Sequence, residues 1–204
     1  MRMSEHPQRS EQWFAERLGL PTASNFGKLI TPTGKSTTGK TRETYINELI
    51  AESVTGKRQE HFVTYAMQWG IDNEDIARSE FQTWYAKDNE ITDANFCFHE
   101  IIACGASPDA FIDSDGLLEI KCPQPATLIG YHREGILPDQ YKAQVQGQLW
   151  VCERDYCKFF AWHPDIPPFL FHVERDEQFI QKLESEIMSV ASTIASYSEE
   201  LRNR

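Results

Sequence analysis

The chain has 204 residues, of which 40% are hydrophobic and 12% are aromatic. A chain of this length can bury a large core, so one domain spanning residues 1–204 is expected, without disulfides or a structural metal. The N-terminal residues lack the apolar core of a signal peptide, no apolar run approaches the roughly 20 residues of a membrane span, and the cysteines form no C-x-x-C pair. A soluble cytoplasmic protein is therefore expected.

The net charge of −11 argues at first against a nucleic-acid partner, but the acidic residues are unevenly distributed. Residues 61–120 contain two Lys/Arg against twelve Asp/Glu, whereas residues 1–60 contain nine against seven. Two interpretations remain open: a solvated acidic face, or a divalent-metal site beside a separate basic contact surface.

The periodicity of apolar residues predicts the secondary structure in chain order. Helical spacing marks four segments: 42–56, 66–85, 139–152 and 176 onward. Strand-like patterns mark three segments: 96–106, 109–123 and 156–163. The last helix repeats apolar residues at steps of three and four up to Tyr197 and Leu201, which indicates packing or a subunit interface. The mixture predicts an α/β or α+β domain.

The segment 109–123 has the pattern of a hairpin that carries charged residues. With a turn at residues 114–116, Asp109 would lie opposite Lys121, and Phe111 opposite Glu119. Because side chains alternate across a strand, Asp109, Glu119 and Lys121 would share one face and the alternate residues would face the core.

Two carboxylates and an ammonium on one face indicate a chemistry. Carboxylate oxygens suit a hard cation such as Mg²⁺, and a lysine can orient the attacking water or offset charge on a phosphate. Asp109, after Pro108, and the run Glu119-Ile120-Lys121 fit the P-D and [DE]-x-K pattern of phosphodiester hydrolysis. The alternative is a surface hairpin with a cross-strand salt bridge.

A further acid, Glu74, lies on the predicted helix 66–85. Its neighbours at steps of three and four are apolar or small, namely Met67, Gly70, Ala77, Phe81 and Trp84. A carboxylate in such a stripe needs a partner, which could be the same cation or an arginine.

These residues resemble a known family. Four blocks carry the resemblance in order: RLGLPTAS (17–24), WGIDNEDIAR (69–78), SPDAFIDSDGLLEIKCP (107–123) and AQVQGQLWV (143–151). From about residue 13 to 163 the chain resembles the phage-lambda-type alkaline exonucleases, the viral recombinase branch of the PD-(D/E)xK nuclease superfamily.

The resemblance implies a restriction-endonuclease-like core, in which helices flank a central mixed β-sheet and a long helix ends the chain. It implies Mg²⁺-dependent 5′→3′ degradation of linear double-stranded DNA, with Mn²⁺ as a substitute, preferring 5′-phosphorylated ends and leaving 3′ single-stranded tails. It also implies a ring-shaped homotrimer and a single-strand annealing protein as partner. An endonuclease of the same fold is the alternative.

The resemblance also implies roles for individual residues. The metal ligands would be Glu74, Asp109, Glu119 and the carbonyl of Ile120, with Lys121 as the catalytic lysine. The residues that grip the 5′-terminal phosphate would be Arg17, Ser24, Ser107 and Gln144.

One motif points elsewhere. Residues 34–41 satisfy the phosphate-loop pattern G-x-x-x-x-G-K-[ST] and would suggest an NTPase. A phosphate loop follows a buried strand, whereas here Pro32 interrupts a short run. In the family that the chain resembles, this place carries a variable, lysine-containing loop, which implies that Lys35, Lys40 and Arg42 contact the DNA backbone.

Overall fold

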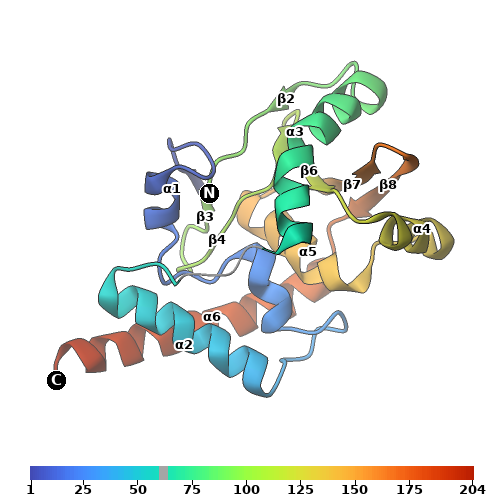
Figure 1. Ribbon diagram of the computed structural model, residues 1–204. Helices are drawn as coiled ribbons and strands as arrows, with labels where there is room; N and C mark the ends of the chain where they lie inside the picture. Colours follow the sequence, from blue (N-terminus) through green and yellow to red (C-terminus); the bar gives the residue numbers. More distant parts are fainter. Residues whose placement is uncertain (60–63) are drawn as a thin grey trace.

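The computed structural model describes residues 1–59 and 64–204 (Figure 1). The helices are α1 (Glu11–Glu16), the 3-10 helix η1 (Ala23–Lys28), α2 (Lys40–Thr55), α3 (Tyr65–Tyr85), α4 (Pro125–Glu134), α5 (Asp139–Cys152) and α6 (Glu177–Arg202). The strands are β1 (Arg2–Met3), β2 (Ile91–Thr92), β3 (Cys97–Phe98), β4 (Gly105–Ala106), β5 (Ala110–Ile112), β6 (Gly116–Lys121), β7 (Tyr156–His163) and β8 (Ile166–Glu174).

A five-stranded mixed sheet forms the centre of the fold, in the order β2-β5-β6-β7-β8. The β6 and β7 strands are parallel, and the other neighbouring pairs are antiparallel. The parallel pair requires a crossover, and the segment containing α4 and α5 supplies it. A small antiparallel sheet, β1-β3-β4, lies beside the N-terminal helices.

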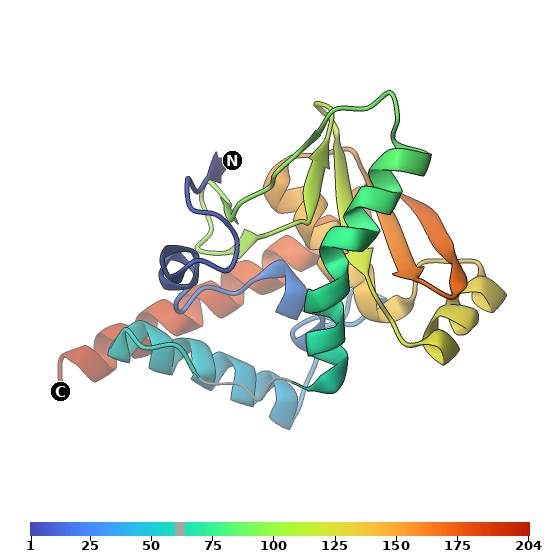
Figure 2. The same ribbon diagram turned by 45° about the horizontal axis from the view of Figure 1, so that its top comes forward.

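Both faces of the central sheet are covered. On one face Leu118, Ile120 and Phe160 pack with Ala77 and Phe81 of α3. On the other face the core includes Leu117 and Phe159 of the sheet, with residues of α5 and α6. Figure 2 shows α3 crossing in front of the sheet and α5 behind it. The predicted mixed sheet flanked by helices is therefore confirmed.

The face of the hairpin that carries Glu119 is more enclosed than we expected. Its neighbour Leu117 is buried against the main core, and Glu119 itself is 2% exposed. Because α5 covers this face, the carboxylate of Glu119 lies inside the protein and needs polar partners there.

A glycine allows η1 to approach α5 closely. A Cβ atom at Gly147 would lie 2.4 Å from the ring of Phe26, and Phe26 is fully buried between the two helices. This contact fixes the η1 segment against the helix that covers the sheet.

The C-terminal helix α6 runs alongside α2 and ends away from the sheet (Figure 1). Its N-cap, Asp176, accepts a hydrogen bond from the N–H of Phe179 at 3.0 Å, and the apolar stripe is buried as far as Ile194. The last two residues of the predicted stripe, Tyr197 and Leu201, are 56% and 46% exposed, so packing within the chain covers the stripe only up to Ile194.

The hairpin register also differs from the prediction. Ile112 pairs with Gly116 and Phe111 with Leu117, so the loop is residues 113–115. Asp113 adopts the left-handed conformation, with φ of 49°, that this loop requires. The shift in pairing is two residues, which preserves the face on which each side chain lies, so Asp109 and Glu119 still converge.

Other elements depart from the expected ones. The predicted strand 96–106 is two short strands, β3 and β4, joined by a turn. The elements α1, η1, α4 and β8 were not predicted. In the described part of the chain, no helix is both long and apolar enough to cross a membrane.

Candidate active site

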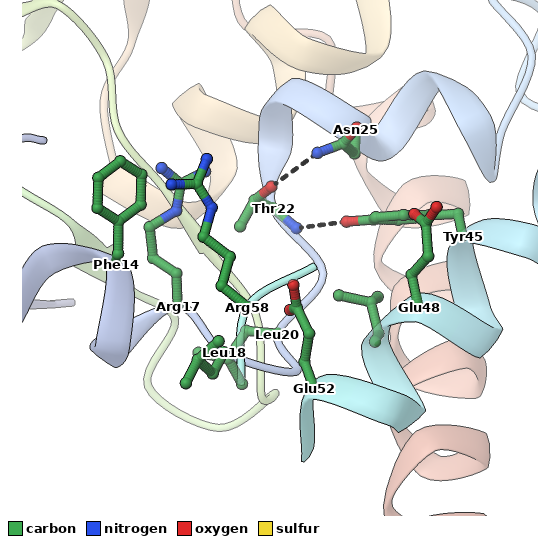
Figure 3. Close-up of a pocket in the computed structure, with 11 residues that line it drawn as sticks. Phe14, Arg17, Leu18, Leu20, Thr22, Asn25, Tyr45, Glu48, Glu52 and Arg58 are labelled. Carbon is green, nitrogen blue, oxygen red and sulfur yellow. Dashed lines mark hydrogen bonds between the residues drawn. The ribbon is translucent and has the colours of Figure 1, made fainter. Parts of the chain in front are cut away.

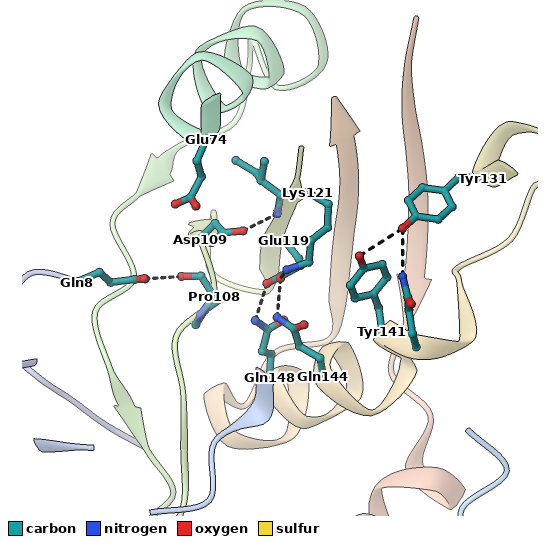
Figure 4. A network of polar contacts seen from close by, with 12 residues as sticks. Gln8, Glu74, Pro108, Asp109, Glu119, Lys121, Tyr131, Tyr141, Gln144 and Gln148 are labelled. Atoms are coloured by element: carbon teal, nitrogen blue, oxygen red, sulfur yellow. Dashed lines mark hydrogen bonds and ion pairs between the residues drawn. The ribbon is translucent and has the colours of Figure 1, made fainter. Parts of the chain in front are cut away.

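Glu119 lies at the centre of a network that joins β6 to α5 (Figure 4). The amide Nε2 of Gln144 donates to its Oε1 at 2.5 Å, and Nε2 of Gln148 donates to its Oε2 at 2.6 Å. The ammonium of Lys121 forms an ion pair with Oε1. The carboxylate is thus held in one orientation by three donors.

The two glutamines lie one turn apart on α5, so both reach the same carboxylate. The sequence analysis assigned Gln144 to the terminal phosphate, and the structure gives it a bond to Glu119. Gln148 was missed, although its spacing of four residues from Gln144 could have indicated a shared partner.

Asp109 lies directly before β5 and faces the same cluster. Its Oδ2 accepts a hydrogen bond from the N–H of Ile120 at 2.5 Å. Burial raises the pKa of this carboxyl well above its usual range, and repulsion by the nearby Glu119 carboxylate raises it further. A buried acid beside another acid is costly unless a cation lies with them.

Lys121 supplies one such positive charge. Burial alone would lower the pKa of its ammonium, but the carboxylates of Glu119 and Asp109 outweigh burial and raise that pKa above its usual value. Its Nζ therefore remains protonated at neutral pH and can donate hydrogen bonds. It is not a base in this state.

Glu74 reaches the cluster from α3, on the opposite side of the hairpin (Figure 4). Burial raises the pKa of its carboxyl, and the ion pair with Arg9, at 2.7 Å, opposes that shift. The predicted apolar stripe around Glu74 is only partly correct, because Met67 and Trp84 are 51% and 63% exposed. The structure gives Glu74 an arginine partner, and its role as a metal ligand stays a prediction.

Two cavities open on this cluster. One, of about 530 Å³, lies between α3 and the segment containing α4 and α5, and its walls include Glu74, Lys121 and Tyr141. The other, of about 220 Å³, is lined by Arg9, Glu74 and Asp109 among others. Glu74 therefore lines both cavities, and a phosphodiester in the larger one would lie against Lys121.

The atoms of the cluster that could bind a metal are of the kind that a hard divalent cation prefers. Asp109, Glu119, Glu74 and the Ile120 carbonyl offer oxygen atoms, the ligands that Mg²⁺ prefers. Among residues 1–59 and 64–204, no three such side chains already enclose a common point. Glu119 is bound by Lys121 and the glutamines, and Glu74 by Arg9, so these contacts would have to adjust.

The four residues predicted to grip a terminal phosphate do not share one cavity. Ser24, which is exposed, and Gln144 line a cavity of about 270 Å³ beside η1. Arg17 lines a separate cavity of about 180 Å³. Ser107 accepts a hydrogen bond from the indole Nε1 of Trp13 at 3.2 Å, and Arg17 stacks on the ring of the same tryptophan.

A second arginine, Arg58, lies beside Arg17 in this cavity (Figure 3). The two guanidinium carbons stack at 3.8 Å and 3.9 Å from the ring centroids of Trp13 and Phe14. Burial lowers the pKa of Arg17 to about 10, and repulsion by Arg58 adds to this. Two neighbouring cations on rigid aromatic supports favour an anion between them. The sequence carried no signal for Arg58, since the pairing depends on tertiary structure.

The lysine-containing loop follows η1 and begins α2. Lys35 and Lys40 are exposed. Arg42 differs from them, because its guanidinium binds Glu186 of α6 at 2.5 Å and the carbonyl of Leu29 at 3.1 Å. These partners give Arg42 a structural role and leave the two lysines as the candidates for DNA contact.

The structure gives no support to a nucleotide site in this loop. The element before it is the 3-10 helix η1, whereas a phosphate loop follows a buried strand. Ser36 donates to Glu186, and Lys182 packs against Gly34, so the loop rests on α6.

Comparison with known proteins places the chain in a family. The model of the YqaJ-like viral recombinase domain matches residues 12–155. No curated protein sequence matches.

Solved structures agree. An alkaline exonuclease (LHK-Exo) from Laribacter hongkongensis is similar at a TM-score of 0.86 and 30% identity, over 95% of this chain and 97% of that chain. The structure of LHK-Exo in complex with dAMP has a TM-score of 0.85 at 30% identity, with the same coverage. A phage related exonuclease from Haemophilus somnus 129PT shares the fold, at a TM-score of 0.65 and 16% identity over 90% of this chain and 96% of that chain.

The resemblance, the fold and the class of enzyme expected from the sequence, that of an alkaline exonuclease, are thereby confirmed. The chain belongs to the YqaJ-like viral recombinase family.

Proposed function

We propose that the protein is a Mg²⁺-dependent 5′→3′ exonuclease that degrades one strand of linear double-stranded DNA and leaves 3′ single-stranded tails. The observation that carries this proposal is the convergence of Asp109, Glu119 and Lys121 on one hairpin, with Glu74 opposite, in a chain with an alkaline exonuclease fold. The oxygen donors suit Mg²⁺, and Mn²⁺ should substitute for it.

In this proposal Asp109, Glu119, Glu74 and the Ile120 carbonyl hold the cation. Bound there, Mg²⁺ would supply Lewis-acid polarisation of the phosphodiester and a more acidic water. Gln144 and Gln148 keep the Glu119 carboxylate oriented through their amide N–H groups.

Lys121 has a defined part in this scheme. Its Nζ keeps its proton, so it orients a water or a phosphate oxygen by donating hydrogen bonds, and it offsets the negative charge that develops on the phosphate.

The preference for 5′-phosphorylated ends rests on the arginine cavity. Arg17 and Arg58 offer two guanidinium groups to one phosphate dianion, and a planar guanidinium can bind such an anion through two parallel hydrogen bonds. Two acids, Glu48 and Glu52, line the same cavity, and Glu52 accepts from the N–H groups of Gly19 and Gln59 at 3.1 Å each. Ser24 and Ser107 do not line this cavity, so their contact with the same phosphate stays a prediction.

The proposal extends to assembly and partners. A homotrimeric ring would enclose the duplex and keep the enzyme on its end, and a single-strand annealing protein would take up the tails. Exposed apolar side chains on α6, Met188, Tyr197 and Leu201, are available for contacts between proteins. A cytoplasmic location is proposed with the same function.

Linear 5′-phosphorylated duplex and covalently closed circular DNA test this proposal directly. Each is incubated with Mg²⁺, with EDTA, and with Mg²⁺ and ATP, beside Glu119→Gln as a control. We expect consumption of the linear DNA alone, with Mg²⁺ required, ATP without effect and the variant inactive. Cleavage of the circles would instead identify an endonuclease, and a requirement for ATP would contradict the proposed chemistry.

A further inference from the structure

Arg9 forms the contact of greatest interest outside the hairpin. Its Nη2 lies 2.7 Å from Oε2 of Glu74, on the wall of the cavity that also contains Asp109. Within the described part of the chain, the Glu74 carboxylate forms a hydrogen bond only through Oε2. The other oxygen, Oε1, therefore has no hydrogen-bond partner there.

The backbone around Arg9 is strained but well anchored. Arg9 has φ of 69°, in the left-handed region that residues with a Cβ rarely adopt. On one side, Gln8 donates from Nε2 to the carbonyls of Ala94 and Pro108, at 2.5 Å and 2.8 Å. On the other side, Ser10 donates to the Pro7 carbonyl and caps α1. The turn is thus fixed directly beside Asp109, which follows Pro108.

Stability does not account for this arrangement. The side chains of Arg9 and Glu74 are 45% and 31% exposed, and an ion pair of that exposure contributes little to the free energy of unfolding. A left-handed arginine costs free energy, and such strain is found mainly where it serves a site.

We propose that Arg9 is a positioning residue for Glu74. It holds one carboxylate oxygen from outside the cluster, and it directs the other oxygen toward the shared cation site. Metal-ligating carboxylates commonly depend on hydrogen-bond partners of this kind, and losing one weakens metal binding about 10- to 100-fold. This inference rests on the proposed function, in that Glu74 is taken as a metal ligand.

Arg78 offers a matched control. It lies on α3, one turn after Glu74, and lines the same cavity. It pairs at the same distance of 2.7 Å, but with Asp93, which is 82% exposed and outside the cluster. Replacing either arginine by methionine removes one charge from the same cavity wall, and only one of the two changes touches Glu74.

The experiment is a titration of DNA-free protein with Mn²⁺, followed through the EPR signal of the free ion. It compares the wild type with Arg9→Met, Arg9→Lys, Arg78→Met and Glu74→Gln. We expect about 10-fold weaker binding for Arg9→Met, a comparable loss for Glu74→Gln, partial recovery for Arg9→Lys, and wild-type binding for Arg78→Met. Thermal unfolding in EDTA confirms that each variant is folded.

The possible failures are distinguishable. If Glu74→Gln weakens Mn²⁺ binding and Arg9→Met does not, or if Arg78→Met has the same effect as Arg9→Met, the role of Arg9 is overturned and the proposed function stands. If the wild type binds no Mn²⁺, the proposed function and this inference both fail.

Discussion

Replacing Gln148 by methionine tests whether the buried face of α5 orients the Glu119 carboxylate in the site. Gln148 is 1% exposed and donates to Oε2 of Glu119 at 2.6 Å, so the variant removes one of three donors to a buried carboxylate. Methionine occupies a similar volume without hydrogen-bonding groups of comparable strength.

The size of the effect follows from two opposing contributions. Loss of a hydrogen bond to a charged group costs about 1.5–3 kcal/mol. The side-chain oxygen of Gln148 has no partner among the described residues, and removing it offsets about 1 kcal/mol of that loss. A net destabilisation of about 0.5–2 kcal/mol should lower the melting temperature by about 1–8 °C for a protein of this size.

The variant should affect the Mg²⁺ requirement of the enzyme more than its stability. With Glu119 less firmly held, the Mg²⁺ concentration for half-maximal digestion should rise about 10-fold or more. The matched control is Gln146→Met, on the same helix and 3% exposed. Gln146 bonds the Glu174 carbonyl and the N–H of Asp176, away from the site.

Thermal unfolding in EDTA and Mg²⁺-dependent digestion of linear duplex give the two measurements. Both variants should melt at lower temperature, and only Gln148→Met should need more Mg²⁺. An unchanged Mg²⁺ requirement in Gln148→Met, or an equal increase in Gln146→Met, would refute the reasoning.

Three further predictions concern stability and end recognition. Asp109→Asn should raise the melting temperature of the metal-free protein at pH 7, because the raised pKa of Asp109 means that its charge opposes folding. Thermal scans should show this gain vanish below about pH 4, where the carboxyl is protonated in both the folded and the unfolded protein. Arg58→Gln should reduce the ratio of kcat/KM for 5′-phosphorylated over 5′-hydroxyl duplex by about 10-fold, as expected for a lost charged hydrogen bond. The neighbouring Lys57→Gln should leave that ratio unchanged. Equal ratios in the two variants would exclude Arg58 from the phosphate site. Gly147→Ala should destabilise the protein by about 1–3 kcal/mol, since its Cβ would collide with the ring of Phe26; wild-type unfolding would mean that η1 can shift freely.

Segments with strong periodicity were predicted well from the sequence. The predicted helix 139–152 and strand 156–163 agree with α5 and β7 at both ends, because their boundaries coincide with clear changes of pattern. Helix 42–56 agrees with α2, which stops at Gly56 in the left-handed conformation.

The strand β8 was missed for a physical reason. Pro167 and Pro168 argue against a strand, because proline cannot donate to a sheet. The structure places β8 at the edge of the sheet, paired with β7 alone, where proline is tolerated. Position in a sheet is a tertiary property that local pattern does not contain.

The hairpin register was wrong for a similar reason. The side chain of Asp113 accepts hydrogen bonds from Asn89 and from the N–H of Glu90, at 2.6 Å and 2.8 Å, which support its left-handed backbone. The acids and the lysine could be read from the sequence because strand alternation survives a shift of two. Arg9 and Arg58 could not, and neither could the bonds from the glutamines to Glu119, since each contact joins residues distant in the chain.

The most direct measurement uses a linear duplex that carries a 5′-phosphate on one strand only, with a different fluorophore inside each strand. Wild-type protein with Mg²⁺ should remove the phosphorylated strand from its 5′ end and leave the other intact, and Glu119→Gln should remove neither. Equal loss of both strands, shortening from the 3′ end, or an active Glu119→Gln variant would contradict the account.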